Sequence, residues 1–191
     1  DSDWSSDVCS SDLDEFNFVS VGNLIKHKRM HHTIKAFNKA FKNNPKVKMT
    51  IIGGGPEKRN LESLIKDLNL EDRVSLTGRI ERKKIAEHFK YSDVFILASK
   101  GETFGVAFIE AMASGLPVIA TRCGGPEHFI KKEQGLIIER NNINKLSEAM
   151  QIIYKNIDNY NNKKISKMTI EHFSPQNIAK QITEVYKEVL N

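Results

Sequence analysis

From Glu15 onward, the sequence alternates short β-rich runs with longer segments of helical period. FNFVSV, KMTIIG and VSLTG are strand-like, and HTIKAFNKAFK and KRNLESLIKDL lie between them with apolar residues at helical spacing. KKIAEHFK, VFIL, FGVAFIEAMA, PVIAT and GLII continue the series. Because parallel strands need a long crossover, which a helix usually supplies, this alternation predicts an α/β fold: a parallel sheet with helices on both faces.

Two further helices are expected after the last strand. Asn142 can cap a helix from Ile143 to about Tyr160, and Ser174 with Pro175 opens a final helix that runs to Leu190. That final helix carries an apolar stripe formed by Ile182, Val185, Tyr186 and Val189.

Residues 1–14 differ from the rest of the chain. They show no helical or strand period and contain the single tryptophan. The segment from Asp3 to Leu13 can be back-translated into a sequence that resembles a widely used short-read sequencing adapter. We therefore expect residues 1–14 to be an extraneous tail from adapter read-through, and a nucleotide record with different codons there would contradict this.

The composition narrows the function classes. A hydrophobic content of 39% is ordinary for a globular protein, and we find no signal peptide and no apolar run near the roughly 20 residues of a membrane span. Cys9 and Cys123 lie in different contexts, which favours a reducing, cytoplasmic setting over a disulfide framework. The net charge of +5 comes from dispersed lysines, so we expect solvated helix faces and no nucleic-acid partner. No metal is expected, since the pair His31 and His32 has no ligand partner at suitable spacing.

Each expected strand ends in glycine or a polar turn, at the carboxyl edge where open α/β sheets bind ligands. In GNLIKHKR, Gly22 gives backbone access and the lysines can reach phosphate oxygens. IIGGGPEKRNL permits close approach of a ligand or of neighbouring backbone. It lacks the G-x-G-x-x-G spacing of a dinucleotide turn and the G-K-[ST] ending of a P-loop, which disfavours NAD and ATP.

The stretch GETFGVAFIEAMASGLPVIAT is the most informative. Its helical period starts at about Phe104, so free N–H groups and the positive end of a helix form a site for a diphosphate or an oxygen-rich sugar. These N–H groups belong to Thr103, Phe104, Gly105 and Val106. Glu102 stands at the mouth of this site, and Glu110 follows about two turns along. Apolar neighbours surround Glu110, so we expect its carboxylate to have a specific partner, such as paired ribose hydroxyls or a backbone amide.

The next strand is followed by TRCGGPEHF, another loop at the same edge. Here Gly124 to Glu127 form a loop-to-helix junction. Cys123 has no base spaced to activate it, so we interpret it as a small buried residue and not as a nucleophile.

The chain from Phe16 to Leu190, with these four loops in this order, resembles the C-terminal, donor-binding domain of a GT-B glycosyltransferase of family 4 (group 1). The most specific part is the E-x-x-x-x-x-x-x-E pattern of Glu102 and Glu110, followed by GGPE. VGNLIKHKRM, IIGGGPEKRNLESLI and RVSLTGRI support it. The resemblance implies a Rossmann-like, nucleotide-sugar-binding domain at residues 15–171, a crossover helix at residues 172–191, and an N-terminal acceptor domain that is absent.

The resemblance also implies roles for individual residues. Glu102 would contact hydroxyls of the donor sugar, Glu110 would hold the ribose, and Lys28 would be the cationic clamp of the diphosphate. The implied substrate-binding residues are Gly22, Asn23, Arg79, Ile80, Thr103, Phe104, Gly105, Val106 and Glu110, with Arg79 and Ile80 near the base and the amides of Phe104 to Val106 around the diphosphate.

One position departs from the family pattern. Asn23 stands where many members have arginine, so one positive charge is missing or is supplied by Lys26, His27 or Arg29.

The implied reaction is transfer of a glycosyl group from a UDP- or GDP-linked sugar to a sugar or lipid-linked acceptor. It proceeds with retention of configuration and needs neither metal nor cofactor. A cytoplasmic protein is implied, with peripheral attachment to the inner face of the membrane left open. Because the acceptor half is absent, we expect the chain alone to bind donor weakly and to transfer sugar poorly or not at all.

Two alternatives stay open. A sugar-nucleotide 2-epimerase shares the GT-B architecture, although the paired glutamates followed by GGPE argue against it. A noncatalytic sugar-nucleotide-binding module is the other, and an intact upstream acceptor domain in the source gene would disfavour it.

Overall fold

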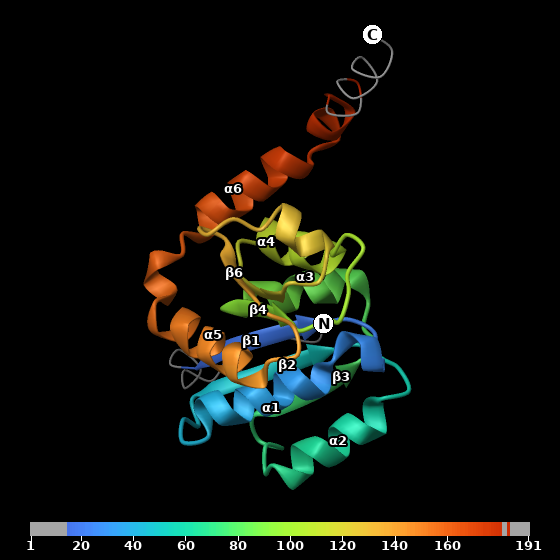
Figure 1. The fold of residues 1–191 in the computed structure, drawn as a ribbon, viewed down its shortest axis with the longest axis vertical. Coiled ribbons are helices and arrows are strands. Elements are labelled where there is room, and N and C mark those ends of the chain that lie inside the picture. Colours follow the sequence, from blue (N-terminus) through green and yellow to red (C-terminus); the bar gives the residue numbers. More distant parts are fainter. Residues whose placement is uncertain (1–14, 181–182, 184–191) are drawn as a thin grey trace, which may run out of the picture.

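A computed structural model describes residues 15–180 and residue 183, and it contains one six-stranded parallel sheet (Figure 1). The strands are β1 (Phe16–Val21), β2 (Val47–Ile52), β3 (Val74–Gly78), β4 (Val94–Leu97), β5 (Val118–Thr121) and β6 (Gly135–Ile138). Their order is β3-β2-β1-β4-β5-β6, so the direction of winding reverses between β1 and β4. The predicted α/β fold with a parallel sheet is confirmed.

The main helices form two groups on opposite sides of the sheet (Figure 1). α1 (Met30–Phe41) packs against α2 (Lys58–Asp67) and α5 (Ile143–Lys155), whereas α4 (Val106–Ala113) packs against α3 (Arg82–Lys90) and α6 (Asn162–Phe173). Among the described residues, short 3₁₀ turns occur at η2 (Lys26–Lys28), η3 (Gly125–His128) and η4 (Ile157–Asn159).

The core lies on both faces of the central strands. Every residue of β4 and β5 is buried, as expected for strands that are covered on both sides and read as continuous apolar runs. Edge-to-face rings link the sheet to the helices: Phe95 lies 5.1 Å from Phe108 of α4, and Phe18 lies 6.4 Å from Phe37 of α1. Both helix layers are therefore anchored to the strands from which the loops of the carboxyl edge emerge.

Three details differ from the predicted elements. α4 begins at Val106 and not at about Phe104, because Gly105 adopts a left-handed φ of 88° that interrupts the helix. α5 ends at Lys155, before the predicted Tyr160. α6 was not predicted at all, although Asn161 caps it by accepting a hydrogen bond of 2.9 Å from the N–H of Lys164.

Several predictions lie outside the described residues. Residues 175–180 are helical, as expected for the start of the last helix. The apolar stripe of Ile182, Val185, Tyr186 and Val189, the tail at residues 1–14 and Cys9 are not among the described residues. Within the described part, none of the helices has the length and apolar character needed to cross a membrane.

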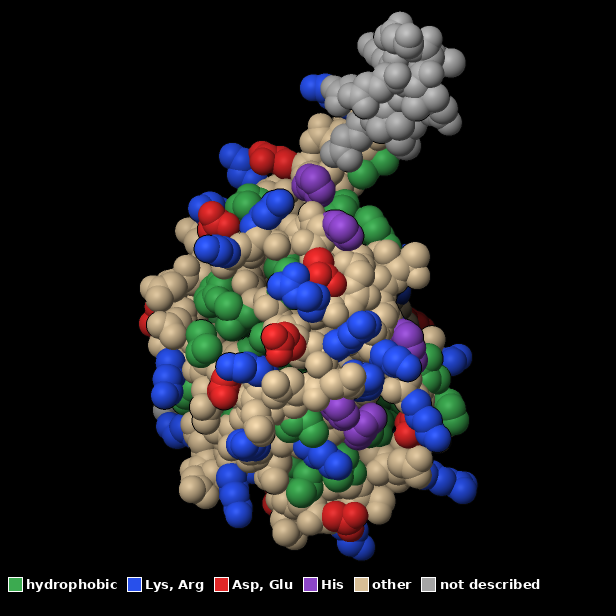
Figure 2. All heavy atoms as spheres, in the orientation of Figure 1, with side chains coloured by type: hydrophobic (Ala, Val, Ile, Leu, Met, Phe, Trp, Pro, Cys, Tyr) green, Lys and Arg blue, Asp and Glu red, His purple; other side chains and the backbone are tan. Residues whose placement is uncertain are grey.

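Charged side chains of both signs are interspersed on the face shown in Figure 2. Lysine and arginine side chains are scattered across this face together with acidic and histidine side chains, and they form no continuous stripe there. On this face the distribution matches the predicted solvated surface.

Candidate functional site

A cleft of about 600 Å³ opens at the carboxyl edge of the sheet, where the strand order reverses between β1 and β4. This is the place at which open α/β sheets bind their ligands. Ten of the eleven predicted site residues line it: Gly22, Asn23, Lys28, Arg79, Ile80, Glu102, Thr103, Phe104, Gly105 and Val106. The remaining one, Glu110, does not.

The glycine run after β2 brings two backbone segments into close contact. A Cβ atom on Gly53 would lie 1.9 Å from the carbonyl oxygen of Gly22, and one on Gly55 would lie 2.4 Å from that of Leu24. The N–H of Gly22 donates to Ile52 and that of Leu24 to Gly54, both at 3.0 Å. The glycines are thus needed for the approach of neighbouring backbone, which was one of the two reasons predicted for them.

The loop after β4 presents free donors to the cleft. The N–H groups of Thr103, Phe104 and Gly105 donate to no acceptor within the part of the chain that the structure describes. They precede the first turn of α4, whose N-terminus adds a positive partial charge. Such an arrangement of N–H groups is suited to an anionic ligand.

Lys28 and Glu102 meet at the mouth of this loop. The Nζ atom of Lys28 lies 2.5 Å from Oε1 of Glu102, and the two side chains are only 21% and 10% exposed. Lys28 comes from the loop after β1 and Glu102 from the loop after β4, 74 positions apart. The ammonium has three donors, so two remain for a ligand while Glu102 holds the third.

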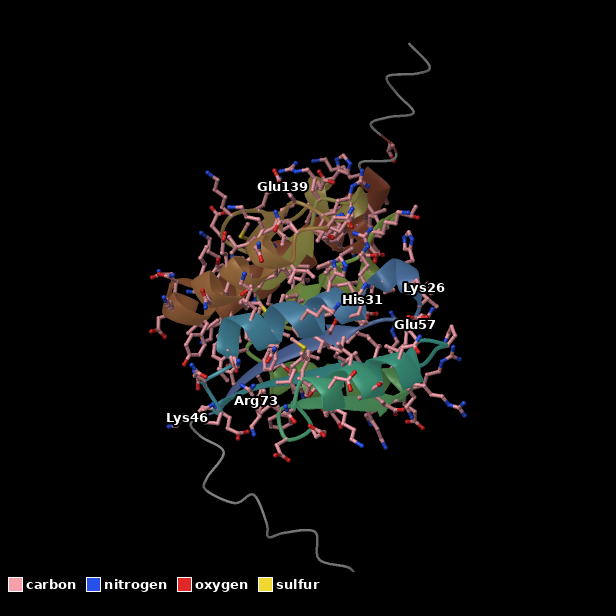
Figure 3. The ribbon with its side chains drawn as sticks, turned by 60° about the horizontal axis from the view of Figure 1, so that its bottom comes forward. Lys26, His31, Lys46, Glu57, Arg73 and Glu139 are labelled. Atoms are coloured by element: carbon pink, nitrogen blue, oxygen red, sulfur yellow. The ribbon has the colours of Figure 1, made fainter. Side chains whose placement is uncertain are left out.

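Asn23 stands where many members of the family have arginine. The three residues proposed to supply the missing charge, Lys26, His27 and Arg29, do not line the cleft. His27 instead shares a hydrogen bond of 2.8 Å between its Nε2 atom and the carbonyl oxygen of Gly101, which ties the loop after β1 to the loop after β4. Lys26 lies toward His31 and Glu57 in a separate groove between α1 and α2 (Figure 3).

The cations that line the cleft are Lys28 and Arg79. In the neighbouring groove between α1 and α2, burial and the charge of Lys35 lower the pKa of His31, so this histidine favours its neutral form.

Glu110 has a partner that sequence reasoning missed. Its Oε1 atom accepts hydrogen bonds from Nη2 and, at 3.1 Å, from Nε of Arg82 at the start of α3. The pKa of Arg82 is raised by this hydrogen bond and by the charge of Glu110. The predicted specific partner thus exists, but it is a guanidinium and not the suggested backbone amide. The role of Glu110 toward a ribose stays a prediction.

The GGPE segment, Gly124 to Glu127, packs against the loop after β4. The N–H of Gly125 donates to the carbonyl of Glu102 at 2.8 Å, and a Cβ atom at Gly125 would lie 2.5 Å from the carbonyl oxygen of Phe104. Glu127 fixes the turn, because its Oε1 accepts from the N–H of Gly124 at 2.9 Å. Cys123 is buried, and burial raises the pKa of its thiol, which fits the predicted space-filling role.

No cluster of three or more potential metal ligands occurs among residues 15–180 and 183. His31 and His32 pack edge to face with ring centroids 4.5 Å apart. The predicted independence from metal stays a prediction.

Comparison with known proteins decides the class of this chain. The sequence profile of the family described as "Glycosyl transferases group 1" matches residues 6–169. The chain belongs to this family of glycosyltransferases. This chain is 31% identical over 150 residues to an uncharacterized glycosyltransferase of Haemophilus influenzae, and the match covers 78% of this chain and 42% of that protein. It is 30% identical over 175 residues to the N-acetyl-alpha-D-glucosaminyl L-malate synthase of Bacillus anthracis, covering 90% of this chain and 45% of that protein.

Solved structures agree with this assignment. A structure of S. aureus TarM, determined in complex with fondaparinux, alpha-GlcNAc-glycerol and UDP, matches 90% of this chain and 35% of its own with a TM-score of 0.81 and 26% identity. The glycosyltransferase chain has the Rossmann-like architecture of the C-terminal type of GT-B domain. It spans less than half the length of the relatives named here.

Proposed function

We propose that this chain is the donor-binding half of a retaining, metal-independent glycosyltransferase. In this proposal it binds a nucleoside-diphosphate sugar, linked to UDP or GDP, for transfer to a sugar or lipid-linked acceptor. One observation carries the proposal: Lys28, Glu102 and the free N–H groups of Thr103 to Gly105 converge on one cleft at the switch point of the sheet. The UDP-bound state of TarM supports it.

The chemistry needs stabilisation of a leaving diphosphate. Negative charge grows on the diphosphate as the glycosidic bond breaks, and preorganised donors aimed at that charge lower the barrier. The N–H groups of the loop after β4 and the ammonium of Lys28 would supply them. Glu102 would accept hydrogen bonds from hydroxyls of the sugar, which places the anomeric carbon beside the donors that receive the diphosphate.

Binding of the ribose would engage Glu110. Arg82, the partner of Glu110, has a side chain that is 81% exposed, whereas that of Glu110 is 30% exposed. A solvent-exposed ion pair contributes little stability, so releasing or sharing this carboxylate is compatible with donor binding.

The first test is calorimetric titration of the chain with UDP, GDP and ADP in the presence of EDTA. We expect one diphosphate to bind, and Lys28→Met to weaken it by about tenfold or more, because a hydrogen bond to a charged group contributes about 1.5–3 kcal/mol. Lys145→Met is the matched control, since Lys145 forms an exposed ion pair with Glu148 on α5. Failure of all three diphosphates to bind, or equal affinity in wild type and Lys28→Met, would contradict the donor site.

The second test concerns turnover. We expect the chain alone to leave UDP- and GDP-sugars and acceptor sugars unreacted, since the acceptor half would be contributed by another domain. Glycosyl transfer by the chain alone would contradict this, and accumulation of a 2-epimerised sugar would favour the epimerase.

A further inference from the structure

Three aromatic rings gather beside the loop after β4 and form what we call the aromatic cluster: Phe104, Phe129 and Phe173. Phe104 lies in the loop itself, Phe129 follows η3, and Phe173 is the last residue of α6. The centroid of Phe173 lies 5.8 Å from that of Phe104 and 5.4 Å from that of Phe129, in edge-to-face geometry, and Phe104 lies 6.0 Å from Phe129. Three segments that are distant in sequence therefore meet in one cluster.

Phe173 occupies a fixed position because α6 is firmly anchored. Ile165 is buried, and the Oγ atom of Ser166 donates to the carbonyl of Ala113 at the end of α4, at 2.6 Å. Thr169 is buried and accepts a hydrogen bond of 3.0 Å from the side chain of Gln134. α6 ends at Phe173 because Ser174 is extended before Pro175.

The later part of the loop after β4 is held by fewer hydrogen bonds than its start: Gly101 and Glu102 are bonded to neighbouring segments, whereas the N–H groups of Thr103 to Gly105 donate to no acceptor in the described part of the chain. Gly125 holds it from one side through the hydrogen bond to Glu102 and the close approach to Phe104. The side chain of Phe104 is 49% exposed, and its ring contacts within the described part of the chain are those to Phe129 and Phe173. The orientation of this ring and of the peptides on either side of its Cα are linked, since a side chain takes only rotamers that its backbone dihedrals allow.

We propose that Phe173 is a positioning residue for the diphosphate-binding loop. It does not line the cleft. It acts through Phe104, and so sets the direction of the N–H groups of Phe104 and Gly105. This inference rests on the proposed donor function, and it assigns a positioning role to α6, a helix that packs against α4.

The test compares Phe173→Ala with Phe173→Tyr, which keeps the ring, and with Ile170→Ala. Ile170 lies one turn earlier on α6, is 56% exposed and is outside the aromatic cluster. UDP affinity is measured by calorimetry in EDTA. Residual dipolar couplings of the N–H groups of Thr103, Phe104 and Gly105, which report the direction of each N–H bond and do not depend on ring currents, are measured by NMR without added ligand. We expect Phe173→Ala to change these couplings and to weaken UDP binding about threefold to tenfold, as for loss of one aromatic pair, whereas the other two variants resemble wild type.

The readouts separate the two proposals. If wild type binds UDP and Phe173→Ala binds it equally well with unchanged N–H dipolar couplings in the loop, the positioning role is wrong. The same conclusion follows if Phe173→Tyr behaves like Phe173→Ala, because the ring would then be irrelevant. If wild type binds none of UDP, GDP and ADP, the proposed donor function fails, and the N–H dipolar couplings of Phe173→Ala still decide whether the ring controls the loop.

Discussion

Gly125→Ala is a direct perturbation of the proposed diphosphate loop. The added methyl group would lie 2.5 Å from the carbonyl oxygen of Phe104 and 2.7 Å from its Cα and carbonyl carbon. Cβ atoms are essentially never found closer than 3.0 Å to such atoms, and ordinary contact begins at 3.4 Å. The backbone of Phe104 must therefore move by about 0.5–0.9 Å, because the atoms in conflict are main chain and not the end of a flexible side chain.

A movement of this size matters for a hydrogen-bonding loop. A bond to an ionised oxygen is about 2.7–2.9 Å long, so a shift approaching 1 Å brings it to the limit of a useful interaction. Each such bond contributes about 1.5–3 kcal/mol. Loss of one bond, from Phe104 or Gly105, predicts UDP binding weakened by roughly 10- to 150-fold.

Calorimetry with UDP is the assay, and Gly115→Ala is the control. Gly115 follows the opposite end of α4, has a φ of 92°, and a Cβ there would lie 3.0 Å from the carbonyl oxygen of Asn162. We expect both variants to lower the thermal midpoint, whereas only Gly125→Ala should lose UDP affinity. UDP affinity within twofold of wild type for a folded Gly125→Ala would refute the reasoning.

Two further predictions concern stability. Gly53→Ala should lower the free energy of unfolding by about 3 kcal/mol, measured by urea titration. The added Cβ would lie 1.9 Å from the carbonyl oxygen of Gly22 and force apart two loops that are joined by hydrogen bonds. A loss of less than about 1 kcal/mol would contradict this. Burial raises the pKa of Asp93 above its ordinary 3.8 although the N–H of Asn17 donates to it, so the folded state holds this proton more tightly than the unfolded chain. The stability from Asp93 is therefore complete at low pH and is lost as the pH rises from 3.8 through the folded pKa. Asp93→Asn should accordingly gain stability relative to wild type as the pH rises above 3.8, and parallel pH profiles of the two proteins would contradict this.

Much of the sheet could be predicted from the sequence because its strands are buried on both faces. VFIL and VIAT contain no position that must face water, so they stand out from the amphipathic helices around them. The cleft was predictable for a related reason, since the glycines and polar residues that end each strand meet at one edge of a parallel sheet.

α6 was missed because its partner is distant in sequence. Its first turn reads NKK, and it packs against α4, where the Oγ atom of Ser166 donates to the carbonyl of Ala113. Asn161 was the available signal, since it caps the helix as Asn142 caps α5. The start of α4 was predicted too early because the helical spacing of apolar residues does not reveal the left-handed conformation of Gly105.

Side-chain partners across the sheet edge were beyond sequence reasoning altogether. Arg82 and Glu110 lie 28 positions apart on different helices, and His27 reaches Gly101 across 74 positions. No local spacing encodes such pairs, because the strand order of the sheet brings together the helices and loops that carry them. The same holds for the aromatic cluster, whose members belong to three separate elements.

The position of Asn23 gives the loop after β4 added weight in the proposed function. Without an arginine there, and with Lys26 and His27 directed elsewhere, Lys28 and Arg79 are the cations of the described chain that line the cleft. Lys28 is already paired with Glu102. A larger share of the attraction for a diphosphate then falls on N–H groups, whose strength depends on direction far more than that of a point charge. We therefore expect the two residues proposed to set this direction, Gly125 and Phe173, to influence donor affinity more strongly here than in a relative that retains the arginine.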